Sequence, residues 1–70
     1  MDYLGEISAH SKSLERRRDE LLNELKRLEK SLKMGKIDEE TYKRRRREVE
    51  RAIVEVMDRL AQMKFLMGQR

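Results

Sequence analysis

The sequence predicts an all-α protein, an antiparallel two-helix coiled-coil hairpin. Two observations predict this fold: apolar residues recur every seven residues in each half of the chain, and a glycine-containing turn separates the halves. The absence of proline and a charged content of 46% are typical of long, solvent-exposed helices. Disorder is the alternative for so polar a chain, and the regular apolar spacing argues against it.

The apolar residues of each half form a ladder built from steps of three, four or seven residues. The first ladder comprises Leu4, Ile7, Leu14, Leu21, Leu25, Leu28 and Leu32, and the second comprises Tyr42, Val49, Ile53, Val56, Leu60, Met63 and Met67. This spacing places the side chains along one seam of a helix. Arg18 and Arg46 interrupt the two seams. We expect their methylene groups to cover the seam while the charges reach water, and the alternative is that they fix the register of the pairing.

A stop signal followed by a start signal divides the single domain of residues 1–70. We expect the first helix over about residues 3–34, a turn over 35–38 and the second helix over about 39–67. Gly35 suits the left-handed residue that ends a helix, and Asp38 suits the cap that begins the next. Ile37 and Tyr42 flank this cap at the spacing of a hydrophobic staple. A continuous helix through Gly35 is the alternative.

The turn region also resembles a known family. Three leucines precede the turn and an acidic stretch with an aromatic residue follows it, as in Leu25, Leu28, Leu32, Gly35, Ile37, Glu39, Glu40 and Tyr42. Over residues 25–49 this arrangement resembles the short helical hairpins called SHOCT domains, although Thr41 stands where that family usually has an acidic residue. The resemblance implies a small module for oligomerisation or attachment, with no catalytic residues.

A second apolar stripe outside the seam predicts an interface. Its members are Leu22, Val54, Met57, Ala61 and Phe65. In a chain shorter than about 70–80 residues, a single hydrophobic core rarely supplies more than about 3–5 kcal/mol of stability. This chain also has no cysteine for a disulfide. We therefore expect a homodimer, most simply a four-helix bundle, or binding to another protein partner. The alternative is that these residues are scattered surface apolar groups.

Basic residues concentrate around the turn. Residues 26–47 contain ten basic and four acidic residues, a net charge of +6, which leaves −2 for the rest of a chain whose total is +4. Lys43, Arg44, Arg45 and Arg47 are candidate contacts for nucleic-acid phosphates. A solvated, ion-paired surface is the alternative, because consecutive helical residues point in different directions and no aromatic platform for bases accompanies them.

The sequence offers no candidate for catalysis, a cofactor or a metal. His10 is the only histidine and has no ligand cluster around it, and Ser8, Ser11 and Ser13 lack the context of a catalytic motif. No apolar run predicts a membrane span, so we expect a cytoplasmic protein without membrane contact. The low content of Asn and Gln beside 18 basic and 14 acidic residues is thermophile-like. A fragment of a larger coiled-coil protein would have the same features.

Overall fold

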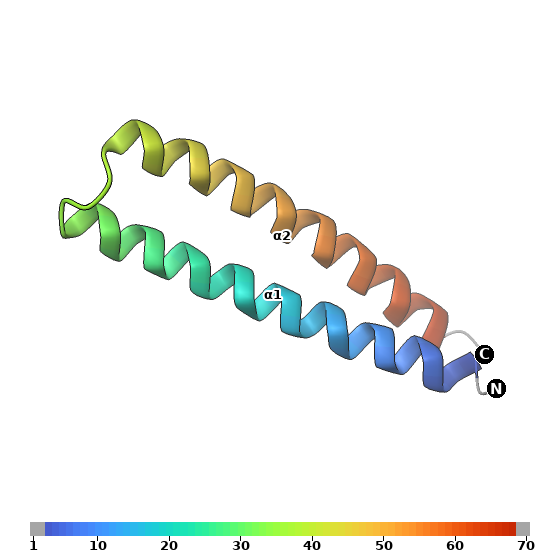
Figure 1. Ribbon diagram of the computed structural model, residues 1–70. Coiled ribbons are helices and arrows are strands. Elements are labelled where there is room, and N and C mark those ends of the chain that lie inside the picture. Colours follow the sequence, from blue (N-terminus) through green and yellow to red (C-terminus); the bar gives the residue numbers. More distant parts are fainter. Residues whose placement is uncertain (1–2, 69–70) are drawn as a thin grey trace.

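The protein is a helical hairpin. A computed structural model describes residues 3–68, apart from the side chains of Leu4 and Met67, whose predicted seam positions therefore lie outside the described part. Helices α1 (Tyr3–Lys33) and α2 (Glu39–Gly68) lie side by side in opposite directions (Figure 1). The hairpin measures 51 × 15 × 15 Å, consistent with helices of about 30 residues at about 1.5 Å per residue. The predicted all-α hairpin is confirmed, and a continuous helix through Gly35 is wrong.

The core is the seam between the two helices. Its buried side chains are Ile7, Leu14, Leu21 and Leu28 from α1 and Val49, Val56 and Leu60 from α2. Those from α1 stand seven residues apart, so a single line along this helix supplies its fully buried groups. Leu25 and Ile53 pack against this core and remain only half-buried. Two helices cover the seam from two sides only, so both of its flanks stay open to water; the flank that Leu22 faces is called the open flank.

The end of α1 is a Schellman motif. The amide of Lys36 donates to the carbonyl of Ser31 at 2.8 Å, and the amide of Gly35 donates to that of Leu32 at 3.0 Å. Gly35 has φ +72°, a left-handed conformation that glycine adopts without steric cost. The turn thus supplies hydrogen-bond donors to the last carbonyls of α1, and the chain leaves the helix at Gly35.

The start of α2 is a capped helix end. The amide of Thr41 donates to a carboxylate oxygen of Asp38 at 2.8 Å, which satisfies one of the free N–H groups of the first turn. Hydrogen bonds from the side chain and the amide of Thr41 lower the pKa of Asp38 below its ordinary value. Ile37 and Tyr42 are half-buried against the core on either side of this cap, as expected of a hydrophobic staple.

The two arginines that interrupt the seams behave differently. The side chain of Arg18 is 32% exposed, and its Nε lies 3.2 Å from a carboxylate oxygen of Asp19. Arg46 is exposed: its guanidinium carbon lies 6.0 Å from the centre of the Tyr42 ring, and its Nε lies 3.5 Å from Glu50. Arg18 thus covers the seam partly with its stem, whereas Arg46 turns aside and stacks over a neighbour on its own helix.

Candidate interaction surface

The residues predicted to form an interface are all exposed in the hairpin. Leu22 is 43% exposed, Met57 47% and Phe65 65%. Val54 is 58% exposed, and Ala61 is exposed as well. Large apolar groups at this level of exposure remain in contact with water, which costs free energy.

These five residues do not all point the same way. Val54, Met57, Ala61 and Phe65 follow steps of three and four on α2 and form a line that we call the α2 stripe. Because each helical residue turns by about 100°, Val54 points about 160° away from the buried Val56 and Phe65 about 180° away. The α2 stripe is therefore on the outer side of α2, away from α1. Leu22 follows the buried Leu21 on α1 and points to the open flank of the seam.

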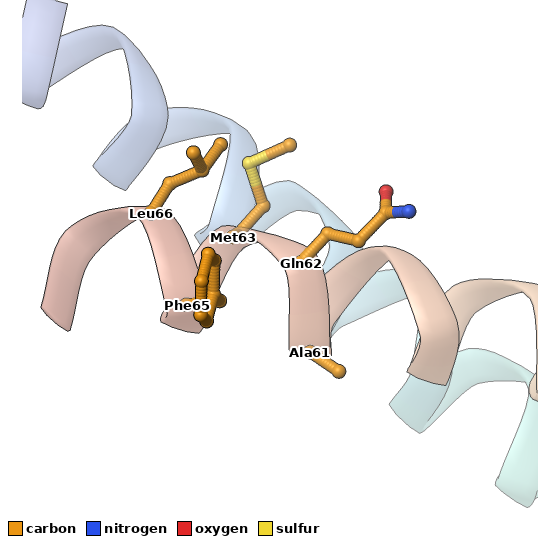
Figure 2. A pocket seen from close by; sticks show the side chains of 5 residues that line it. All are labelled: Ala61, Gln62, Met63, Phe65 and Leu66. Atoms are coloured by element: carbon orange, nitrogen blue, oxygen red, sulfur yellow. The ribbon is translucent and has the colours of Figure 1, made fainter. Parts of the chain in front are cut away.

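A shallow hollow near the end of α2 borders the stripe. Its lining comes from Ala61, Gln62, Met63, Phe65 and Leu66, all on this one helix. Figure 2 shows Met63 and Leu66 projecting from α2 on the side where α1 lies, while Ala61 projects the opposite way. The hollow is thus an open surface between side chains of one helix and does not enclose a small molecule. Leu66 is 41% exposed and was missed from the sequence, because it belongs to neither the seam ladder nor the stripe.

The candidate nucleic-acid contacts at the basic turn are all exposed. Lys43, Arg44, Arg45 and Arg47 project from the first turns of α2. Within residues 3–68 the ion pairs closer than 4 Å join Arg17 to Glu20, Arg18 to Asp19 and Arg46 to Glu50. None of these pairs includes the four candidates, although the charge of Arg44 helps to lower the pKa of the Asp38 carboxyl. Nucleic-acid contact at these four positions and a solvated, ion-paired surface both stay predictions.

Groups for catalysis or metal binding are sparse in the described part of the chain. Residues 3–68 contain no group of three His, Cys, Asp or Glu side chains arranged to hold a metal ion. His10 is exposed on α1, near the end opposite the turn. Neither described helix has an apolar stretch long enough to cross a membrane.

Compared with models of protein families, with curated proteins and with solved structures, the chain matches none. The resemblance of residues 25–49 to SHOCT domains accordingly stays a prediction.

Proposed function

We propose that this chain is a non-enzymatic oligomerisation module that forms a homodimer through the α2 stripe and Leu22. The observation that carries the proposal is the exposure of Val54, Met57 and Phe65, at 58%, 47% and 65%, along one line of α2. A line of exposed apolar side chains along one helix is typical of a protein interface. Because the α2 stripe lies outside the seam, a second molecule can cover it without disturbing the hairpin.

The small core supports the same proposal. The buried apolar side chains of the described part come from a single seam between two helices. A domain of this size commonly gains further stability from a disulfide, a metal or a partner, and this chain has no cysteine. Covering the α2 stripe would add buried apolar area at about 25 cal/mol per Å². Self-association therefore supplies stability that the hairpin lacks alone.

The test is a double substitution that places charges on the stripe. We expect Met57→Lys with Phe65→Glu to sediment as a monomer and to melt at a lower temperature than the unaltered chain, because two charges would have to be desolvated in the interface. The matched control, Ala9→Glu with Asn23→Lys, places the same residues on exposed positions of α1. An unaltered chain that sediments as a monomer at tens of micromolar would overturn the proposal, as would a stripe variant that keeps its dimer.

A second candidate function is binding of nucleic acid at the basic turn, favoured by the exposure of Lys43, Arg44, Arg45 and Arg47. Such binding would rest on phosphate contacts and would weaken steeply with salt. Titration of duplex DNA at 50 and 200 mM salt tests it, with Lys43, Arg44 and Arg47 changed together to Gln. The control changes Lys12, Arg16 and Arg17 to Gln on α1. Absence of salt-dependent binding, or equal losses in both variants, would remove this candidate.

A further inference from the structure

Resting on the proposed homodimer, we infer that the second copy packs its own α2 against the α2 stripe, antiparallel, with the two-fold axis beside Met57. Both molecules then use the same surface, as a two-fold interface requires. The structure supports this through the position of the stripe: Val54, Ala61 and Phe65 point away from α1, so α2 is the helix that a second copy reaches.

The spacing of the stripe is self-complementary in this register. With Met57 beside its own copy, Val54 lies opposite Ala61 of the second copy, so a larger side chain meets a smaller one on each side of the axis. Phe65 then lies near Arg51 of the second copy, at a level where a guanidinium can stack on its ring. Each member of the α2 stripe thus obtains a partner, whereas Leu22, which belongs to α1, stays outside this contact, so the interface is narrower than the one proposed above.

Charges beside the stripe fit the same arrangement. Glu50 and Lys64 border the α2 stripe on the side nearer the open flank, and the antiparallel register places each opposite the other's copy. Glu50 also lies 3.5 Å from Arg46 of its own helix, so Lys64 of the second copy would join an existing exposed ion pair. Residues 46–68, which overlap in the pair, contain four acidic and five basic residues and so carry a net charge of only +1. Asp58 opposes the arrangement, because it lies near its own copy across the axis.

Repulsion between like charges disfavours a parallel pairing of the two α2 helices. Such a pairing would place the ionised residues that border the α2 stripe at the same level as their own copies, and it would bring together two turn regions of net charge +6. In the antiparallel pair these regions lie at opposite ends. With about 32 Å of overlap, two hairpins of 51 Å form a staggered rod about 70 Å long. This staggered pair is longer than a four-helix bundle in which the two hairpins overlap along their whole length.

Cysteine cross-linking tests the register directly, since the chain has no cysteine of its own. We expect Met57→Cys to form a disulfide-linked dimer on mild oxidation. Val54→Cys and Ala61→Cys should each cross-link poorly alone, because each lies about 10 Å along the axis from its own copy, beyond the reach of a disulfide. An equimolar mixture of these two variants should give a Val54→Cys to Ala61→Cys dimer, identified by mass spectrometry. Asn23→Cys on α1 is the control and should remain unlinked.

The possible outcomes separate the register from the proposed function. A parallel pair is indicated if all three α2 variants cross-link with themselves, and an overlapped bundle if Leu22→Cys cross-links while Met57→Cys does not. Either result overturns the inference while leaving the homodimer intact. Sedimentation of the unaltered chain as a monomer would instead remove the dimer itself. Asp58→Asn should tighten the pair by relieving repulsion at the axis, and weaker association in this variant would contradict the register.

Discussion

Two adjacent leucines on α1 allow a sharp test of how this small protein is stabilised. Leu21 is 2% exposed at the centre of the seam, whereas Leu22 is 43% exposed on the open flank. Replacing a buried leucine by alanine costs about 2–5 kcal/mol, since it removes buried methyl groups and leaves a cavity. A core of this size supplies about 3–5 kcal/mol in total. We therefore expect Leu21→Ala to remove most of the stability of the hairpin.

Leu22→Ala is the matched control: the position is only one residue away, and the chemical change and the gain in helix propensity are the same as in Leu21→Ala. In an isolated hairpin it should cost about 1 kcal/mol, roughly half the value for full burial of a leucine. Urea unfolding followed by circular dichroism, at low and high protein concentration, measures both variants. The Leu21→Ala loss should appear at both concentrations, whereas the Leu22→Ala loss should grow with concentration if Leu22 contacts a second copy. Equal losses at low concentration would refute the assignment of the core to the seam.

Three further changes probe the turn and the interrupted seam. Gly35→Ala should destabilise the hairpin by about 1–2 kcal/mol, because its φ of +72° is unfavourable for alanine; the added methyl group would meet open space, so no clash contributes. The control is Gly68→Ala, which has no positive φ and should be neutral or slightly stabilising in thermal melts. The pKa of Asp38 is lower in the folded state than in the unfolded state, so its ionised carboxylate stabilises the fold. This stabilisation is complete above the unfolded-state pKa and is lost as the pH falls through the folded-state pKa. The stability advantage over Asp38→Asn should therefore shrink in urea titrations below about pH 4, and a constant difference would contradict it. Arg46→Leu should raise the urea midpoint, because leucine can enter the seam while the lost exposed ion pair with Glu50 contributes only about 0–1 kcal/mol. A lower midpoint would contradict this and show that Arg46 stabilises the hairpin more than a leucine in the seam.

The hairpin could be predicted from sequence because its signals are local and agree. Gly35 and Asp38 satisfy the backbone groups of their own helix ends, and the seven-residue spacing defines the buried line whatever the partner helix. The behaviour of Arg46 could not be predicted, because its guanidinium can choose between the edge of the seam, the Tyr42 ring and Glu50, and the sequence places all three within its reach. The exposure of Leu66 also could not be predicted, since this residue belongs to neither the seam ladder nor the α2 stripe.

The start of α1 and the end of α2 lie together, at the end of the hairpin opposite the turn (Figure 1). Since the molecule is 51 Å long and only 15 Å wide, a protein joined to either end would be carried on a narrow stalk. Such a fused protein would lie beside the end of α2 that contains the α2 stripe. A bulky attachment should therefore hinder pairing, whereas a cargo inserted at the turn should leave pairing intact.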